Sequence, residues 1–418
     1  MAGPVEKEPR LGWLDGLRGL AAMQVVLLHY AFVFLPAIVA IHPLNMYGFS
    51  LKGLVGTPLV FMYDGNAAVF LFFIISGVAL THAFAARPLD FPTAVLRRVI
   101  RLGLPMAAAV VFAAALFALL PDAHVAASER SGSTALRDIG PREISLPAII
   151  HQIAFEGLLS GFSDFSLLPE WLTKDMGLVP RGQGFNTPLW TLHFEFYGSL
   201  LVMLLVGVRA STSRTIYRAG CVLLACAFAL SPLGLFIVGH VSAGYLRRVD
   251  GRRWQLLVGP AFLGSGILLC TAQIIAPESP LGGLLPPLSS ASQAFEQVLQ
   301  KMLGAILVFG GLALMPVLHR QLERPALRWL GKISFSLYLS HYPLLYTCAA
   351  ACFILLSDLS FGAGVAAVTV VGIVLSLLIA VPFERWIDRP AIRLSRMVGG
   401  ARRRAAAPMM PVAVTEPA

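Results

Sequence analysis

The hydrophobic positions of the chain fall into eight long runs separated by shorter polar segments. A helix needs about 20 apolar residues to cross the hydrocarbon core of a bilayer, and each run approaches or exceeds that length. The pattern therefore predicts an all-α fold, a polytopic bundle of transmembrane helices. The predicted spans are 17–40, 64–85, 98–120, 188–208, 255–276, 298–319, 333–356 and 362–387.

The polar segments between these runs differ in their content of Arg and Lys. Cytoplasmic loops of membrane proteins carry an excess of basic residues, so the basic segments are predicted to lie inside, together with both termini. The basic segments are 86–98, 209–218, 247–253, 320–332 and the C-terminal tail. The segments poor in Arg and Lys, expected outside, are 41–63, 121–187 and 277–297.

Residues 219–246 lie between two basic segments, so the chain must cross the membrane an even number of times there. The stretch is short for two full spans and contains Pro232, which interrupts a helix. We therefore expect a broken hairpin of two short helices, buried among other helices, and about ten spans in total. Residues 146–160 are too few and too polar to span, and we expect an amphipathic helix on the outer surface.

The composition supports a membrane protein. The 418 residues are 57% hydrophobic and 13% charged, whereas about a quarter of the residues of a soluble protein are charged. The net charge of +10 is accounted for by the basic loops, so nucleic acid is not an expected partner. Residues 1–396 form one predicted membrane domain, and we expect the basic, Pro- and Ala-containing tail 397–418 to be cytoplasmic and disordered.

The first apolar run contains three ionisable residues, Asp15, Arg18 and His29, within LDGLRGLAAMQVVLLHY (14–30). Arg18 and His29 are eleven positions apart, which places them on one helix face about 16 Å from each other. Asp15 is within reach of an ion pair with Arg18. Charges inside a membrane are costly unless they face a hydrated interior, so we expect this face to line a cavity. The structural alternative is an Asp–Arg pair and a core histidine.

Polar residues in other runs are further candidates. Glu195 lies in a predicted span close to Trp190, and it could orient a substrate, pair with an arginine or tune His29. Trp190 fits an interfacial anchor. His341 is a second intramembrane imidazole, for which packing or a hydrogen bond to Tyr338 or Ser336 is the structural alternative. No metal site is expected, because the cysteines show no metal-binding spacing with histidine.

Five blocks of the sequence resemble the acyltransferase-3 family of bacterial membrane O-acyltransferases. In family order from residue 14 to 394, they are LDGLRGLAAMQVVLLHY (14–30), FFIISGVAL (72–80), NTPLWTLHFEFY (186–197), LGKISFSLYLSHYPLL (330–345) and FERWIDRPAIRL (383–394). The chain has Asp388-Arg389-Pro390 where the family usually has Glu-Arg-Pro, and we expect this block to close the last helix at the cytoplasmic surface.

The resemblance implies transfer of an acyl group from cytoplasmic acyl-CoA to a hydroxyl in the bacterial inner membrane, with acetyl-CoA the favoured donor. Acyl-CoA is then a co-substrate, and no permanently bound cofactor is expected. His29 fits the general base, since an imidazole can take a hydroxyl proton at neutral pH. Arg18 could hold an acidic part of the donor or stabilise developing negative charge.

The family's Arg-x-x-Arg spacing falls on Arg98 and Arg101, which follow Arg97 at the start of the third run. Two guanidinium groups one turn apart can bind the phosphates of coenzyme A. The alternative is a basic anchor that sets the topology.

The sequence thus predicts an acyltransferase whose partners are acyl-CoA, membrane lipid and a carbohydrate or lipid-linked acceptor. Exopolysaccharide, lipopolysaccharide and a lipid-linked precursor all remain open as acceptors. The rival is a polytopic transporter, which would also have buried charge and broken helices. No repeated half is visible in the sequence, which argues against that class. A non-catalytic sensor that binds acyl-CoA is a third class.

Overall fold

A computed structural model of the protein describes residues 11–35, 57–86, 90–209, 211–246, 253–271 and 293–398. Over these residues the chain forms helices, turns and irregular connections, and its one β-type pairing is an isolated bridge between Phe162 and Phe165. The predicted all-α class is therefore confirmed for the described part of the chain. The predicted tail from residue 399 onward and the outer segment 277–292 lie outside the described residues.

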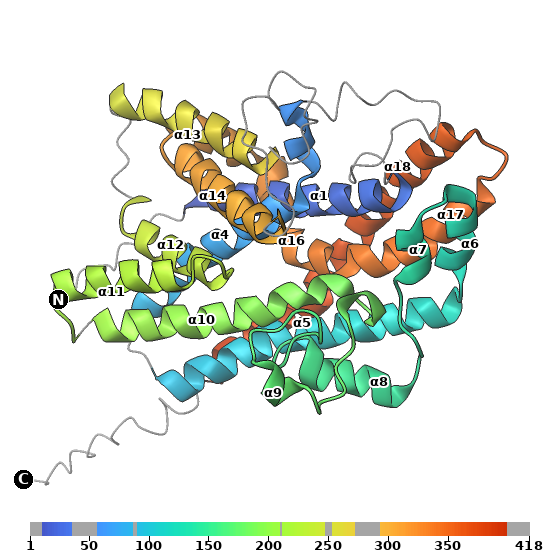
Figure 1. The fold of residues 1–418 in the computed structure, drawn as a ribbon, viewed down its shortest axis with the longest axis horizontal. Helices are drawn as coiled ribbons and strands as arrows, with labels where there is room; N and C mark the ends of the chain where they lie inside the picture. The colour runs from blue at the N-terminus through green and yellow to red at the C-terminus, as the bar shows by residue number, and fades with distance from the viewer. Residues whose placement is uncertain are drawn as a thin grey trace, which may run out of the picture.

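Six of the described helices are long and apolar enough to cross a bilayer, and each coincides with a predicted span. Three of them, α1, α5 and α10, run roughly along the long axis of the molecule (Figure 1). The six helices are α1 (Gly12–Phe34), α4 (Gly65–Ala85), α5 (Phe91–Leu119), α10 (Trp190–Arg209), α16 (Pro325–Leu344) and α18 (Phe361–Phe383).

The prediction of about ten spans is not confirmed. In the described ranges, six helices qualify, and a seventh span is added if a bent pair of helices counts as one. That pair joins α14 (Gln293–Ala313) to α15 (Pro316–Leu322) with a bend of 95°. Two other apolar helices are shorter. The helix α12 (Leu233–Ala243) has 11 residues and is about 16 Å long, half the hydrocarbon thickness. At the predicted span 255–276, the helix α13 (Arg253–Thr271) has a shorter apolar part, Leu257–Thr271.

Two short helices are present where the broken hairpin was predicted, α11 (Arg214–Ala227) and α12 (Leu233–Ala243). The expectation that both are buried holds for α12 only, because Cys221 is the one buried residue of α11. Pro232 is the N-cap of α12, so the break falls at the predicted residue. The helix α12 packs closely on α4, because a Cβ on Gly239 would overlap the backbone oxygen of Ile74. A short helix is thus buried against a spanning helix, as small residues at the contact allow.

Residues 121–187, the cap segment, follow the C-terminal end of α5 and contain several short helices. The predicted amphipathic helix at 146–160 is present as α8 (Leu146–His151), which continues as the π-helix η2 (Gln152–Glu156). The others are α6 (Ala123–Ser131), α7 (Thr134–Asp138), α9 (Glu170–Thr173), η3 (Arg181–Gln183) and η4 (Thr187–Leu189). In Figure 1 the helices α6 to α9 lie along α5 and beyond its C-terminal end.

Two spanning helices continue beyond their α-helical part. After α16 the chain forms the π-helix η7 (Leu345–Ala349) and then α17 (Ala350–Leu355). After α18 it forms the π-helix η8 (Glu384–Asp388) and then α19 (Arg389–Met397). The expectation that Asp388-Arg389-Pro390 closes the last helix is therefore wrong, because Pro390 occupies the first turn of α19, where its missing N–H costs no hydrogen bond.

Candidate functional site

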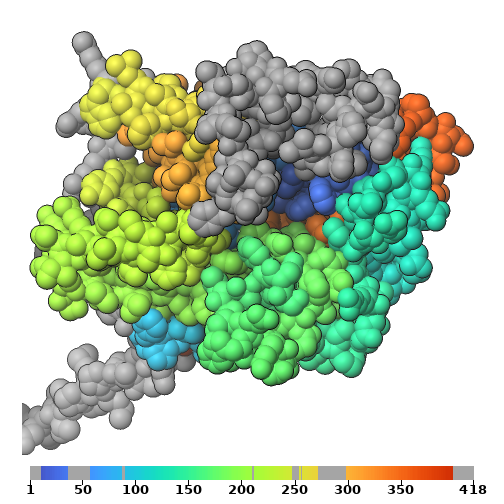
Figure 2. Space-filling model, in the orientation of Figure 1, coloured from blue at the N-terminus to red at the C-terminus, as the bar shows by residue number. Residues whose placement is uncertain are grey.

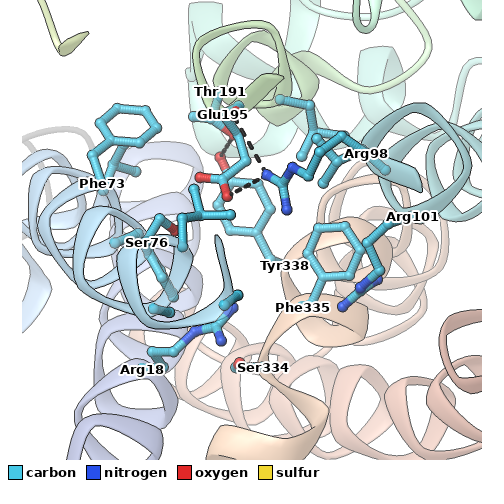
Figure 3. A pocket seen from close by; sticks show the side chains of 17 residues that line it. Arg18, Phe73, Ser76, Arg98, Arg101, Thr191, Glu195, Ser334, Phe335 and Tyr338 are labelled. Atoms are coloured by element: carbon cyan, nitrogen blue, oxygen red, sulfur yellow. Dashed lines mark hydrogen bonds and ion pairs between the residues drawn. The ribbon is translucent and has the colours of Figure 1, made fainter. Parts of the chain in front are cut away.

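A cavity of about 250 Å³ lies between α1, α4, α5, α10 and α16. Figure 3 shows its polar side chains converging from these helices on a common space. Its polar or ionisable lining residues are Arg18, Ser76, Arg98, Arg101, Thr191, Glu195, Ser334 and Tyr338. This inner cavity therefore contains Arg18, Glu195 and two of the three arginines predicted from the sequence, together with Tyr338.

A second cavity of about 540 Å³ adjoins the first. The two share four lining residues, so they lie side by side, and they are called the inner and the outer cavity below. The shared residues are Arg18, Arg101, Ser334 and Phe335. The outer cavity adds charged residues, namely Asp15, Arg328, Lys332, Glu384 and Asp388.

Arg18 lines both cavities because α1 and α16 approach closely beside it. A Cβ on Gly331 would overlap the backbone oxygen of Asp15, so the two backbones can meet only at a glycine. The Arg18 side chain projects into the space between the helices (Figure 3). Its Nε atom is buried and makes no hydrogen bond with a described residue. Arg18 thus retains hydrogen-bonding capacity at the junction of the two cavities.

Arg98 and Glu195 form an ion pair inside the inner cavity. The distance from Arg98 Nη2 to Glu195 Oε1 is 2.9 Å, and the side chains are 14% and 18% exposed. Of the three roles considered for Glu195, pairing with an arginine is thus the one observed. The guanidinium group of Arg98 is partly neutralised before any ligand binds.

Arg101 is paired as well, with Asp388 from the end of η8, and its guanidinium carbon lies 5.0 Å from the centre of the Phe335 ring. Residues almost three hundred positions apart thus meet at the junction of the cavities. Asp388 is 4% exposed, so its carboxylate depends on Arg101 as its partner. Arg97 lines neither cavity, and it does not join the other two arginines.

His29 lies beside His341, with 2.9 Å between His29 Nδ1 and His341 Nε2. His341 Nδ1 lies 2.9 Å from the backbone oxygen of Leu337, one turn earlier in α16. The ring of Tyr342 packs edge-on against His29, with 5.1 Å between the ring centres. His341 is fully buried, whereas His29 is only partly buried. Sequence reasoning named both histidines but did not predict this contact.

His29 does not line the inner cavity, although it shares α1 with Arg18. The wall between them contains Tyr338, whose ring centre lies 6.0 Å from that of His341 and 6.1 Å from that of Phe72. The expectation that His29 and Arg18 share one cavity is therefore not met by the inner cavity, because aromatic side chains fill the space between the two levels.

The cavity nevertheless ends close to the level of His29. A Cβ on Gly65 would contact the side chain of Leu28, so the start of α4 lies beside the residue before His29. Val69 lines the inner cavity, and it lies about 6 Å along α4 from Gly65. The inner end of the cavity and the histidine pair are thus separated by about one helical turn.

Tyr338 and Trp190 have different surroundings. The Tyr338 hydroxyl lies 3.0 Å from the backbone oxygen of Pro188 and 2.9 Å from Thr191 Oγ1, so the cavity wall is fixed to the start of α10. Trp190 packs edge-on against Phe165, with ring centres 4.8 Å apart, and does not line the inner cavity. Its neighbours are aromatic side chains, which fits a structural role.

His193 and His29 illustrate two environments for a buried imidazole. His193 Nε2 accepts a hydrogen bond from the backbone N–H of Leu167 (2.9 Å), and Nδ1 lies 3.1 Å from the backbone oxygen of Leu158. Both nitrogens of His193 are thus used to tie the cap segment to α10. His29 has only one of its ring nitrogens in the contact with His341.

Part of α1 is also visible at the surface of the molecule. Figure 2 shows dark blue atoms of α1 beside the teal and green atoms of the cap segment. Among the described residues no group of His, Cys, Asp and Glu has the arrangement of a metal site. The ionisable groups in and beside the inner cavity are arginines, a carboxylate, a tyrosine and two imidazoles.

Of the comparisons with known proteins, only the one with protein families gives a match. No curated protein and no solved structure matches the chain. The acyltransferase domain described by the Acyl_transf_3 family model matches residues 11–385, which include α1 and all the cavity-lining residues except Asp388 and Ile392. The chain therefore belongs to the acyltransferase-3 family.

Proposed function

We propose that the protein transfers an acyl group, with acetyl the favoured group, from acyl-CoA to a carbohydrate hydroxyl at the bacterial inner membrane. Family membership supports a membrane acyltransferase. The observation that carries the finer proposal is the pair of adjoining cavities, of which the outer is lined by charged residues and the inner has an aromatic wall near a histidine pair. A long donor with an anionic end and a reactive neutral end fits such a space.

The outer cavity suits the phosphates of coenzyme A. Two of its acidic residues already have partners, because Asp388 pairs with Arg101 and Glu384 pairs with Arg389 at 2.6 Å. Arg18, Arg328 and Lys332 line the same cavity and supply further positive charge for an anion. We therefore assign phosphate recognition to residues of α16 and α1 as well as to Arg101 of the predicted Arg-x-x-Arg pair.

The inner cavity suits the pantetheine arm. Most of its lining is apolar and aromatic, with Phe72, Phe73 and Phe335 among its walls. Arg98 and Glu195 lie within this part, where paired charges can bind the amides of the arm without a net charge in the membrane. The thioester then lies toward Tyr338.

The position of Arg18 favours one of the two roles considered for it. Arg18 lines both cavities, whereas His29 lines neither of them. The two residues are eleven positions apart on α1, or about 16 Å along the helix axis. Arg18 is therefore assigned to the anionic part of the donor, and His29 to the reacting end.

In the proposed reaction, His29 accepts one proton and returns it within the same turnover. His29 takes the proton of the acceptor hydroxyl as its oxygen attacks the thioester carbonyl carbon and the new C–O bond forms. The tetrahedral intermediate then collapses, the C–S bond breaks, and the protonated His29 returns the proton to the leaving thiolate. The products are the O-acyl ester and free coenzyme A. An acyl-histidine intermediate is the covalent alternative.

The acceptor is proposed to approach from the side of the cap segment, at the end of α1 that carries His29. His29 is partly exposed, and atoms of α1 are visible beside the cap segment (Figure 2). Donor and acceptor would then enter from different ends of α1. Exopolysaccharide, lipopolysaccharide and lipid-linked precursors all offer the required hydroxyl group.

The test uses the purified full chain in lipid nanodiscs with radiolabelled acetyl-CoA and a carbohydrate fraction extracted from bacterial envelopes. Label transferred to carbohydrate, with release of free thiol in equal amount, supports the proposal. Release of thiol without labelled carbohydrate, or binding without thiol release, overturns it. Transport of carbohydrate into sealed vesicles without labelling would establish the rival transporter class.

A further inference from the structure

We infer that His341 is a positioning residue that fixes the tautomer of His29 and makes His29 Nε2 the nitrogen that accepts the substrate proton. This inference rests on the proposed function, since it concerns the same proton transfer. It is argued from the hydrogen bonds of the two rings, from their unequal burial and from the way in which α16 holds His341.

The backbone fixes the tautomer of His341. Its Nδ1 atom lies 2.9 Å from the Leu337 oxygen, and a carbonyl oxygen can only accept a hydrogen bond. Nδ1 therefore carries a hydrogen. His341 is fully buried, where a neutral ring is favoured over a charged one, so its Nε2 has a free lone pair.

The tautomer of His29 follows from that lone pair. His341 Nε2 can only accept, so the contact of 2.9 Å requires His29 Nδ1 to donate. The lone pair of neutral His29 is then on Nε2. This nitrogen points away from His341, on the side chain that is only partly buried. Nε2 is therefore the nitrogen left to accept the proton of a substrate hydroxyl, while Nδ1 is held by His341.

The same contact assists the proton transfer. When His29 Nε2 takes a proton, the ring becomes positively charged and its Nδ1–H remains directed at His341 Nε2. A hydrogen bond from a charged donor is stronger than a neutral one, so the pair stabilises the protonated state that exists only during the reaction. His341 does not need to exchange a proton itself.

The fold holds His341 rigidly. Pro343 has no N–H to donate to the backbone oxygen of Leu339, and that oxygen instead accepts a hydrogen bond from Asn186 Nδ2 at 2.8 Å. The π-helix η7 follows directly, with the Thr347 hydroxyl donating to the Pro343 oxygen at 2.6 Å. A π-helix at this point is typical of a functional constraint on a helix. The end of the cap segment and α16 thus clamp the turn that carries His341.

The experiment compares His341→Gln, which offers an amide oxygen in place of Nε2, with His341→Leu, which offers no acceptor. In the acetyl-CoA assay described above, His341→Leu should lower kcat by roughly 10²-fold or more and leave KM for acetyl-CoA within about threefold. His341→Gln should recover at least a tenth of the wild-type kcat. His240→Gln is the matched control, because His240 is a buried imidazole bonded to Thr81 and Tyr217 and is expected to retain wild-type kcat.

The tautomer itself is read from ¹⁵N NMR of histidine-labelled protein, with the His29 signals assigned by their loss in His29→Gln. Wild-type protein should give the neutral Nδ1–H form, and His341→Leu should lose that preference. Equal kcat for His341→Leu and wild type, with His29→Gln inactive, would overturn this inference and leave the proposed function standing. Full activity of His29→Gln would instead overturn the proposed base and this inference with it.

Discussion

The two ends of the candidate site handle polar groups in opposite ways. At the donor end, arginines are paired with carboxylates from distant helices, as in Arg98–Glu195 and Arg101–Asp388. Beyond Tyr338, two imidazoles are in contact, those of His29 and His341, and aromatic rings and backbone atoms lie beside them. The difference follows from the cost of charge, which is tolerable near a wide, charged cavity and severe in a buried aromatic layer.

Under the proposed function, this difference separates donor binding from proton transfer. An anionic donor would need fixed positive charge, and carboxylate partners would keep that charge stable when the donor is absent. The proposed proton transfer needs a group that changes charge within one turnover, and an imidazole can do so. Variants at the histidine end should therefore lower turnover, whereas variants at the arginine end should weaken donor binding.

The largest expected effect is at the histidine end. His29→Gln keeps the size and hydrogen bonding of the side chain but cannot accept a proton at neutral pH. We expect turnover to fall by roughly 10²- to 10⁴-fold, the usual contribution of a positioned general base. Equilibrium binding of acetyl-CoA, measured by calorimetry, should change less than about twofold. Near wild-type turnover would make His29 a packing residue.

The next effect is at the paired arginines. Arg98→Ala or Arg101→Ala should weaken acetyl-CoA binding by about 10- to 100-fold, the scale of a hydrogen bond to a charged group, about 1.5–3 kcal/mol. Lys should restore binding only in part, because it lacks the planar fork. Each Ala variant also leaves a carboxylate unpaired, so the double variant Arg98→Ala/Glu195→Ala separates loss of folding from loss of donor contacts. Unchanged affinity in every variant would reduce these arginines to topology anchors.

A smaller effect is expected at the mouth of the outer cavity. Arg328→Ala and Lys332→Ala should each weaken acetyl-CoA binding by about three- to tenfold and lower its dependence on salt, because these side chains are exposed and screened. Acetyl-pantetheine, which lacks the phosphates, should bind both variants like wild type. Arg320→Ala and Arg324→Ala are matched controls on exposed basic residues that line neither cavity. Equal losses with acetyl-pantetheine would contradict phosphate recognition by this face.

Reporter fusions that leave activity intact test whether the two ends face opposite sides of the membrane. Insertions in 320–332 should report cytoplasmic, and insertions in the exposed part of 121–187 should report outside, as the distribution of basic residues predicts. The segment 209–218 should also be cytoplasmic, together with 247–253, most of which lies outside the described residues. If a reporter at 247–253 lay outside while one at 209–218 lay inside, residues 219–246 would cross the membrane an odd number of times, which would contradict the predicted hairpin.

The spanning helices were predictable because their signal is local. A run of apolar residues identifies a helix such as α4 without knowledge of its neighbours, and Pro232 marks the break between α11 and α12. The number of spans was less predictable, since a helix of 11 residues such as α12 is apolar in sequence whether or not it crosses. Its length and its packing against α4 become visible only in three dimensions.

For the candidate site, too, the sequence identifies the residues, and only the structure shows their contacts. The sequence by itself determined which residues are costly in a membrane: Arg18, His29, Glu195 and His341 each stand out as a polar group in an apolar run. Their partners are up to 312 positions away, as for His29 and His341, and no periodicity or spacing connects such positions. Only the packing of α1, α5, α10 and α16 decided that Arg98 meets Glu195, that Tyr338 closes the cavity and that the histidines touch, because each contact depends on where two helices cross.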